Sequence, residues 1–518
     1  MNLAAAAALV VLATAVLRLV PGLTWPRHAM DGGYHMLLRR EIRRHGMTMP
    51  RRVAAMALDE EQTYPWWYHW LLALFPERWL IRLPPLVSTL LDSAHAIIVV
   101  VLAARLVPEA GATAGLVAGL LFATAPALLV VGIGPRAYEI TPRPLGELSF
   151  TIFMAAGGAF VVTRDPIWIV TATLAGVVLL MSSKFAAQVV VFCAPVVAVI
   201  AHSWVPVLFA IGTFAAALLL TRGRYWWVLS GQWKHLSIFR RRLQHEHAIL
   251  RDRNRWAALA AAIGRATRAP RDREALGDLA RLAEHNTVLQ FLLRNLLWCG
   301  TLALLATGQF PAWQEEPGWQ RWLVGWAVAP IAPFLLSSLR RFRFLGEAER
   351  YPEYGVPAVS VLAAAGLLAL GEGERTALLV VYAVSLIPVF AYSLLRQRWN
   401  AQRARGPGMG DVTTFLKTLP RGRTILPIPW FSAYVLAPVL EHRFLAGNDT
   451  RVWHRDYERI FSSYPWPVTD LTYWRSRGAE LALVEWRSLA EDDAPSYDLG
   501  GLPLLYEDVR FRVYRLDR

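Results

Sequence analysis

The sequence contains very little lysine and almost no cysteine. Lysine occurs only as Lys184, Lys234 and Lys417, so arginine carries nearly all of the positive charge. Cys193 and Cys299 both stand inside apolar runs, and their spacing matches no zinc motif. Two isolated thiols of this kind favour packing between helices over metal binding. The bias towards Arg, Ala and Leu is typical of GC-rich bacterial genomes.

The chain also lacks the marks of a transporter. No internal repeat, direct or inverted, is apparent. A transporter would need such a repeat, broken helices or ionisable residues at midspan that face a cavity. One pair offers the last feature, Asp92 with His95 in "LLDSAHAII", although polar pairs of this kind more often bond between helices. A multi-pass lipid or polysaccharide transporter or flippase stays the alternative function.

Long apolar runs are abundant instead. Hydrophobic residues make up 55% of the 518 residues, and most of them fall in runs of roughly 17–25 residues, the length that crosses a bilayer as helix. Trp and Tyr gather at run ends, as in "TYPWWYHW", which suits an interfacial belt. We therefore predict an α-helical polytopic membrane protein with about eleven transmembrane helices.

The expected spans follow one another from the first residues to about residue 394. Residues 3–20 are expected to be a retained helix, because no basic segment precedes them as in a signal peptide. The segment 64–76 is too short to span and is interpreted as an interfacial or re-entrant helix. The predicted spans are 3–20, 85–106, 112–133, 146–163, 167–181, 185–201, 204–221, 286–307, 319–338, 356–371 and 375–394.

An odd number of spans places nearly every complex polar loop on one face of the membrane. The other face receives only short connectors. This distribution predicts one assembled site at one membrane surface, and not a path through the bilayer. The segments on the loop-rich face are 21–84, 134–145, 182–184, 222–285, 339–355 and the tail from 395.

Three regions follow from these patterns. Residues 1–395 form a membrane module with a long first loop (21–84) and a basic loop (222–285), 396–411 a linker, and 412–518 a small α/β domain. The basic loop holds 14 Lys and Arg against 6 Asp and Glu. It predicts an amphipathic helical pair that lies on anionic headgroups or lines a site for an anionic lipid substrate. In the tail we expect strands at 423–430, 479–486, 503–509 and 510–516, and a helix at 431–445.

The first candidate site is the stretch "MDGGYHMLLRREIRRHG" (30–46), directly after the first apolar run. If residues 32–45 are helical, Asp31 and His35 share a face and can reach one group together. Gly32 and Gly33 let another chain or a ligand approach the backbone closely. The alternative is that Asp31 caps a helix and His35 lies on the surface.

Basic residues in other loops of the same face suit phosphate oxygens. "GPRAYEITPRPLGEL" (134–148) carries Arg136 and Arg143, and "MSSKF" (181–185) carries Lys184. "RFRFLGEAERYPEYG" (341–355) adds Arg350 beside Glu347. The alternatives are arginines that reach to lipid headgroups at helix ends, and a local pair between Glu347 and Arg350. An acid near several cations is what transfer from a lipid-linked phosphate requires, because the cations stabilise the leaving phosphate and the acid accepts a proton or holds a metal.

With these motifs in their order, the chain resembles the GT-C superfamily of polyprenol-dependent membrane glycosyltransferases. This group includes protein O-mannosyltransferases, aminoarabinose transferases and oligosaccharyltransferases. The resemblance rests on "MDGGYH" after the first span, "YPWWYHWLLAL" before the second, "RAYEITPRPLGEL" after the third and the late "GEAERY". It covers the whole architecture, with a long first loop, about eleven to thirteen spans and an extracytoplasmic C-terminal domain.

The resemblance implies residue roles. Asp31 matches the catalytic acid of the first loop, and His35 a polar partner found near it. Arg136, Arg143, Lys184 and Arg350 fall in loops that bind lipid phosphate. Glu139 and Glu347 are candidates for a second acid. Many members have two adjacent acids where this chain has Asp31 followed by Gly32, so a divalent metal, Mg²⁺ or Mn²⁺, stays open.

The resemblance also implies partners and location. The expected donor is a polyprenyl-phosphate-linked sugar, the acceptor a lipid, glycan or protein, and nucleic acid is not a partner. The expected location is the bacterial inner membrane among membrane lipids, with the site and the C-terminal domain on the periplasmic face. The positive-inside rule would place these arginine-rich loops in the cytoplasm. We follow the resemblance, because the basic loop is long and other arginines have a proposed phosphate role.

Overall fold

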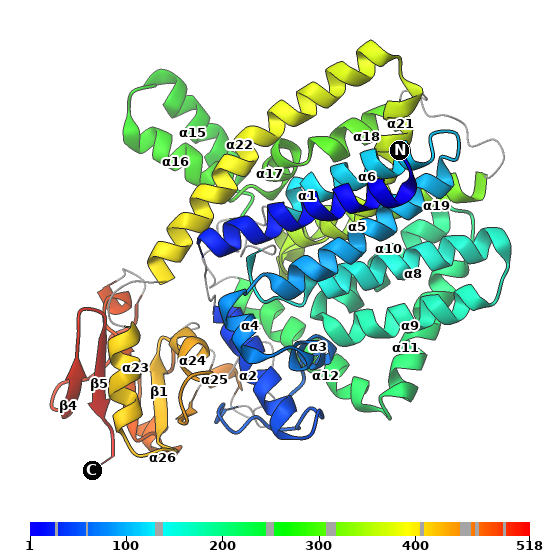
Figure 1. Cartoon of the computed structure of the whole chain (residues 1–518). Coiled ribbons are helices and arrows are strands. Elements are labelled where there is room, and N and C mark those ends of the chain that lie inside the picture. The colour runs from blue at the N-terminus through cyan, green and yellow to red at the C-terminus, as the bar shows by residue number, and fades with distance from the viewer. Residues whose placement is uncertain are drawn as a thin grey trace.

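The computed structural model describes residues 1–25, 30–58, 61–129, 138–244, 253–306, 317–404, 409–445, 457–460, 466–490 and 494–517. The chain is mostly helical, with one small sheet near its C-terminus (Figure 1). The helices form a bundle, and the sheet lies beyond one end of the long helix α22 (Glu372–Ala404). This arrangement agrees with the predicted helical membrane protein that carries a small C-terminal sheet.

Five helical segments of the described chain are long and apolar enough to cross a membrane. They are α1 (Leu3–Thr24), α5 (Leu86–Leu106), α8 (Arg143–Thr163), Ala348–Ala369, which ends in α21 (Val356–Ala369), and Glu372–Trp399 of α22. Two bent pairs raise the number to seven: α11 (Val205–Leu220) with α12 (Arg224–Ile238), and α17 (Thr287–Arg294) with α18 (Leu296–Ala306). These helices support a multi-pass membrane protein, and eleven spans are not confirmed.

Short helices and breaks within the expected spans account for the difference. The expected spans 167–181 and 185–201 form α9 (Ile167–Ser182) and α10 (Lys184–Ile200), which have only 16 and 17 residues. Residues 112–133 give α6 (Ala112–Thr124), which stops before Pro126, because proline cannot donate the next helical hydrogen bond. Residues 286–307 bend by 79° between α17 and α18. Residues 319–338 divide at Pro330 into α19 (Pro317–Val328) and α20 (Ile331–Ser338). The placement of all polar loops on one face depends on the span count, so it stays a prediction.

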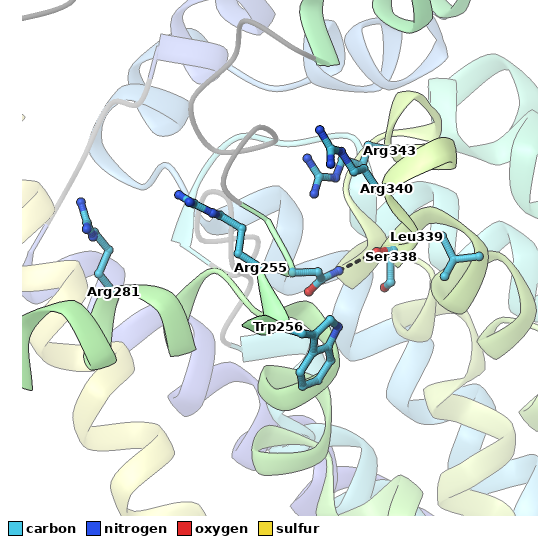
Figure 2. A pocket seen from close by; sticks show the side chains of 8 residues that line it. Arg255, Trp256, Arg281, Ser338, Leu339, Arg340 and Arg343 are labelled. Carbon is cyan, nitrogen blue, oxygen red and sulfur yellow. Dashed lines mark hydrogen bonds between the residues drawn. The ribbon is translucent and has the colours of Figure 1, made fainter. Parts of the chain in front are cut away.

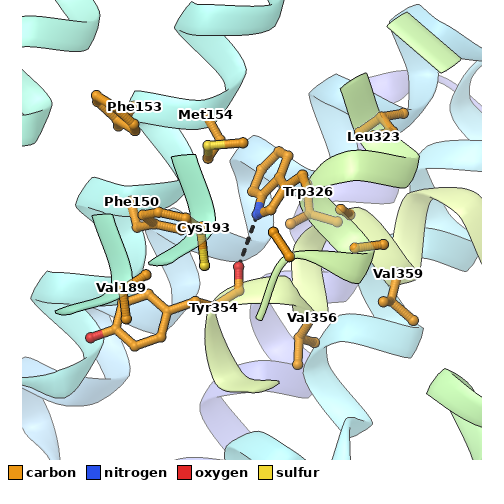
Figure 3. Close-up of a cluster of buried hydrophobic side chains, with 14 of the residues drawn as sticks. Phe150, Phe153, Met154, Val189, Cys193, Leu323, Trp326, Tyr354, Val356 and Val359 are labelled. Carbon is orange, nitrogen blue, oxygen red and sulfur yellow. Dashed lines mark hydrogen bonds between the residues drawn. The ribbon is translucent and has the colours of Figure 1, made fainter. Parts of the chain in front are cut away.

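The centre of the bundle is a tightly packed apolar core. Phe150 of α8 packs near Cys193 of α10 (Lys184–Ile200) and Trp326 of α19 (Figure 3). The Trp326 indole Nε1 donates a hydrogen bond of 2.9 Å to the carbonyl oxygen of Tyr354. The Cys193 side chain is buried among these residues, so the packing role expected for this thiol is confirmed.

A buried ion pair joins the first two long helices. Arg18 of α1 donates from Nε to Asp92 of α5 at 2.9 Å, and both side chains are fully buried. The Arg18 guanidinium also donates to the carbonyl oxygen of Ala123 at 2.8 Å. His95 bonds to the hydroxyl of Thr151 in α8 at 2.7 Å. The polar residues of the second span therefore bond between helices, as expected for such a pair.

The C-terminal sheet contains five strands in the order β2-β1-β3-β5-β4. β1 is parallel to β2 and β3, whereas β5 is antiparallel to β3 and β4. All four predicted strands are confirmed, as β1 (Thr424–Ile428), β3 (Leu481–Glu485), β4 (Leu504–Glu507) and β5 (Phe511–Arg515). The helix expected at 431–445 is correct only in its first half, because α24 (Phe431–Leu436) is followed by β2 (Arg443–Phe444).

The helices of the C-terminal region pack around this sheet (Figure 1). They are α23 (Met409–Thr418), α24, α25 (Tyr457–Ile460) and α26 (Leu471–Ser476). The linker expected at 396–411 is helical over 396–404, because α22 continues to Ala404. Residues 405–408 lie outside the described residues.

The first loop docks on the C-terminal region. The Ala57 amide donates to the Phe444 carbonyl at 2.8 Å, and the Phe444 amide donates to the Ala55 carbonyl at 2.9 Å. Helix α2 (Met30–Arg44) packs on α24, and a Cβ atom on Gly33 would overlap the carbonyl oxygen of Tyr434. The close approach to the backbone expected at Gly33 is confirmed, and the group that approaches is the backbone of α24.

We expect Gly33→Ala to loosen the contact between α2 and α24. An added Cβ would also lie 3.0 Å from the Tyr434 carbonyl carbon, and backbone cannot move aside as a flexible side chain can. Overpacking of this kind costs about 1–3 kcal/mol. Thermal unfolding in detergent should therefore begin at lower temperature, with faster proteolysis of the C-terminal region.

Gly32→Ala is the matched control in the same helix. A Cβ atom on Gly32 would meet Ile140 at an ordinary distance of 3.8 Å. Alanine also has a higher helix propensity than glycine by about 1 kcal/mol, so this variant should be at least as stable as the original protein. Equal stability of the two variants would show that the backbone of α24 does not pack closely on α2 at Gly33.

Candidate active site

Helix α2 is held in place along its second half. The Arg39 side chain is buried and donates to the carbonyl oxygens of Leu72 at 3.1 Å and Phe75 at 2.6 Å. Arg39 and Arg40 both pair with Glu77 of α4 (Glu77–Arg82). The hydrogen bond from Arg40 and the charges of both arginines lower the pKa of the Glu77 carboxyl, against the effect of burial. The carboxylate is therefore ionised at neutral pH, and its ion pairs hold α2 against α4 within the first loop.

The first half of α2 carries Asp31. The segment is helical, as the proposed shared face of Asp31 and His35 required. The side chain of Asp31 lies outside the described residues, as does Arg136. The backbone places Asp31 in the first turn of α2, next to Gly32, which lies against Ile140. The acid predicted from the first loop is therefore carried to the segment that precedes α8.

His35 lies in a buried cluster of aromatic and imidazole rings, which we call the histidine cluster (His35, Tyr64, Tyr68 and His69). His35 Nδ1 and His69 Nε2 are 2.8 Å apart, so one imidazole donates a hydrogen bond to the other. The two tyrosines pack on these imidazoles. Burial raises the pKa of the Tyr68 phenol, so it is neutral at physiological pH. The surface position considered for His35 is wrong, because only 3% of this residue is exposed.

Glu139, a candidate second acid, is buried close to the same elements. Ser88 of α5 donates from Oγ to the Glu139 carbonyl oxygen at 2.9 Å. The Tyr68 hydroxyl lies against Ser88 and the Thr141 backbone. Residues 139–141 are therefore enclosed by α2, α5 and α3 (Trp67–Leu74), which brings Glu139 near the helix that carries Asp31.

The described residues do not supply a metal site. Within the ranges that the structure describes, no three His, Cys, Asp or Glu side chains lie close enough to hold an ion together. His35 and His69 bond to each other instead.

Three predicted phosphate-binding cations come together at the other end of the same segment. We call Arg143, Lys184 and Arg350, with Glu347 and Glu353, the cation cluster. Arg143 lies 3.7 Å from Glu347 and 3.7 Å from Glu353, and Glu347 also pairs with Arg350. The local pair of Glu347 with Arg350, left open by the sequence, is therefore present. Glu347 bridges two cations and lies in this cluster, on a different element from the histidine cluster.

Lys184 joins the cluster through an aromatic ring. Its Nζ lies 6.0 Å from the ring centroid of Phe185, and the Arg350 guanidinium lies 4.7 Å from the same centroid. Both distances are within the range of cation–π attraction. The preceding residue, Ser183, lies against Gly146 of α8, together with the Tyr354 hydroxyl. Residues far apart in the sequence are thus packed around the start of α8 and of α10.

One short segment connects the two clusters. Residues 138–142 lie against α2, α3 and α5, and Arg143 is the first residue of α8. An acid on α2 and cations at the start of α8 are therefore separated by a few residues of one chain segment. This arrangement can place a proton acceptor beside a group of cations that bind a phosphate.

His69 and Glu353 belong to these clusters and were missed by the sequence analysis. His69 stands in "TYPWWYHW", where the aromatic residues suggested only an interfacial belt. Glu353 follows Arg350 within the quoted stretch and is almost fully buried. A buried carboxylate needs a cation. The cation that pairs with Glu353 is Arg143, which is distant in the sequence, so local spacing gave no signal.

Known structures share this arrangement of helices and sheet. No protein-family model matches the chain, and no curated protein does. The structure of ArnT, an aminoarabinose transferase from Cupriavidus metallidurans, in the apo state has a TM-score of 0.58 at 16% identity, over 98% of this chain and 97% of that chain. The chain therefore shares the fold of this structure.

Two further structures share this fold. ArnT from the same organism bound to undecaprenyl phosphate has a TM-score of 0.57 at 15% identity, over 98% of both chains. The Archaeoglobus fulgidus oligosaccharyltransferase AglB, in complex with an inhibitory peptide and a dolichol-phosphate, has a TM-score of 0.51 at 11% identity, over 93% of this chain and 69% of that chain. The likeness in fold therefore spans the helical bundle and the C-terminal sheet.

Proposed function

We propose that this protein is a membrane glycosyltransferase that transfers a sugar from a polyprenyl-phosphate donor to a lipid, glycan or protein acceptor. The observation that carries the proposal is the meeting of Arg143, Lys184 and Arg350 beside the segment that packs on the Asp31 helix. The likeness to ArnT bound to undecaprenyl phosphate, and to AglB with a dolichol-phosphate, supports a polyprenyl-phosphate donor.

The chemistry assigns a role to each cluster. The acceptor oxygen attacks the anomeric carbon of the sugar, and the bond from that carbon to the phosphate oxygen breaks, with inversion. The polyprenyl phosphate leaves with the bonding electron pair, and the cation cluster stabilises its added charge. Asp31 takes the proton of the acceptor oxygen. The histidine cluster helps to fix α2, so that this carboxylate faces the reacting atoms.

The C-terminal region, 412–518, is proposed to cover the site and help to select the acceptor. Its α24 packs on α2 and its β2 pairs with the first loop, so it lies beside the acid helix. We place this face in the periplasm of a bacterial inner membrane. That orientation rests on the GT-C resemblance and runs against the positive-inside rule.

The transporter alternative rested on one polar pair, Asp92 with His95. Asp92 bonds to Arg18, and His95 bonds to Thr151, each between two helices. A polar pair engaged in this way is not available to carry an ion or a substrate through a cavity.

Incubating membranes that contain the protein with labelled undecaprenyl-phosphate sugars tests the proposal directly. Donors with hexose, pentose and amino-sugar headgroups should be compared, and at least one should lose label to an endogenous acceptor. Membranes without the protein are the control. Retention of label on every donor class would overturn the donor assignment first.

We expect Lys184→Gln to weaken donor binding by roughly 10- to 100-fold, because a hydrogen bond to a charged group contributes about 1.5–3 kcal/mol. Binding of a polyprenyl phosphate to the purified protein measures the change. Lys417→Gln is the matched control, because Lys417 is an exposed lysine on α23. The cation cluster is not the phosphate site if the two variants bind the donor equally well.

A further inference from the structure

A basic cavity lies beside the cation cluster and shares no residue with it. It has a volume of about 840 Å³ and is lined by four arginine side chains from two parts of the chain. Figure 2 shows Arg340 and Arg343 of η3 (Arg340–Leu345) on one side, and Arg255 and Arg281 on the other. The other lining residues are Asn254, Trp256, Ser338 and Leu339, so no lining residue is acidic.

The walls of this cavity are fixed by buried hydrogen bonds. The Asn254 side chain donates to Thr287 Oγ1 at 2.8 Å and to the Ser338 carbonyl oxygen at 2.7 Å. The Arg343 guanidinium donates to the Arg253 carbonyl oxygen at 2.6 Å, and Arg253 is itself buried. These hydrogen bonds join three segments of the chain, residues 253–254, Thr287 and residues 338–343, and so fix the shape of the cavity.

The basic surface continues beyond this cavity. Arg340 also lines a neighbouring cavity of about 600 Å³, together with Arg240, Arg341, Gln244, Phe342 and Phe344. Among the described acids, Asp278 pairs with Arg281 of the cavity lining and with Arg265, and Glu349 pairs with Arg253. Neither cavity has an acidic residue among the described residues of its lining.

The rim of the first cavity is apolar and exposed. Trp256 at the start of α15 (Trp256–Arg268) is 53% exposed, and Leu339 is 56% exposed. Leu339 directly follows α20, which ends at Ser338. Trp256 lies two residues after Asn254, whose side chain bonds to Thr287 at the start of α17. Indole and leucine side chains at a helix end are typical of residues that meet the boundary between lipid and water.

We propose that this cavity binds the phosphate-bearing headgroup of an acidic membrane lipid, separately from the sugar donor. Guanidinium groups of Arg255, Arg340 and Arg281 would bind the phosphate oxygens, while Trp256 and Leu339 would contact the start of the acyl chains. A free polyanion would not use the exposed apolar rim. The helical pair α15 and α16 (Arg273–Glu284) is thereby anchored to the lipid surface at a defined place.

The site also adjoins the cation cluster. Arg253, which supports Arg343, donates to the Gly346 carbonyl at 3.1 Å and pairs with Glu349 at 3.4 Å, directly before Arg350. An acidic lipid in the cavity would therefore bind within one layer of side chains of the cation cluster. Binding at the two sites can still be measured separately, because they share no residue.

The test is native mass spectrometry of the full-length protein in detergent, titrated with phosphatidylglycerol, phosphatidylcholine or inorganic phosphate. The test variant is Arg255→Gln with Arg340→Gln. We expect its affinity for phosphatidylglycerol to fall roughly tenfold or more, at about 1 kcal/mol for each basic residue near a lipid surface. The control is Arg421→Gln with Arg475→Gln, which removes the same charge from exposed positions of the C-terminal region, and it should bind as the original protein does.

Each remaining outcome would overturn the inference. Equal affinity of the test variant and the original protein for phosphatidylglycerol would remove the cavity as the site. Equal loss in the control would mean that net charge alone attracts the lipid. Full displacement of phosphatidylglycerol by millimolar inorganic phosphate would make the cavity a site for free phosphate. Melting temperature, measured on every variant, confirms that each one is folded before its binding is compared.

Discussion

Asp31→Asn should leave a folded protein with near-normal donor binding and almost no sugar transfer. A carboxylate with a pKa of about 4 is ionised at neutral pH and can take the acceptor proton, whereas an amide cannot. Loss of a general base lowers the rate by roughly 10²–10⁴-fold. Asp31 stands in the first turn of α2, where a carboxylate stabilises the helix dipole by only about 0.3–1 kcal/mol. Turnover and donor affinity, measured on the same preparation, separate these two effects.

Asp411→Asn is the matched control for this variant. Asp411 also lies in the first turn of a helix, α23, and it is exposed at a distance from both clusters. The two variants should lose similar, small amounts of stability, and only Asp31→Asn should lose turnover. Normal turnover of Asp31→Asn would show that Asp31 only stabilises α2 and is not the general base, and it would contradict the proposed site.

The second large effect concerns stability. Asp92→Asn removes the charge that faces Arg18, and both side chains are fully buried between α1 and α5. Breaking one side of a buried ion pair costs about 3–5 kcal/mol, because the remaining charge has no counterion. We expect a large fall in melting temperature and in the yield of monodisperse protein from size-exclusion chromatography.

The double variant Arg18→Met with Asp92→Leu provides the control. Replacing both partners by apolar residues of similar size is often neutral or stabilising, so this variant should recover most of the lost stability. If Asp92→Asn were as stable as the original protein, the pair would not hold the two helices together.

The sequence predicted best what depends on short stretches of chain. The strands at 424–428, 481–485, 504–507 and 511–515 were found because each is an apolar run with turn residues on both sides. β2 was missed because Arg443 and Phe444 form a strand only through their partners, and no local pattern encodes a two-residue strand. Eleven spans are not confirmed, because several expected spans are short helices or bend, as at Gly223 and Asn295, and composition gives no sign of this.

In the candidate site too, single residues could be predicted from local sequence, whereas contacts between distant segments could not. Arg143, Lys184 and Arg350 were selected one by one as charges in loops between apolar runs, and the fold brings all three together. The pairing of His35 with His69 joins two elements of the first loop, and residue spacing alone could not indicate it. The close approach at Gly33 was predicted, but its partner Tyr434 was not, because Tyr434 is about 400 residues away in the sequence.

The contacts of Gly33 with Tyr434 and of Met56 with Phe444 have a consequence for biosynthesis. The first-loop residues leave the ribosome about 400 residues before their partners, a delay of roughly 20–80 s at about 5–20 residues per second. During this interval α2 has no α24 to pack on, and the edge at Ala55 to Ala57 has no strand to pair with. The site can be completed only after the last fifth of the chain has been translated and has docked. An incomplete chain inserted in the membrane would therefore lack the contacts that hold α2, the helix that carries Asp31.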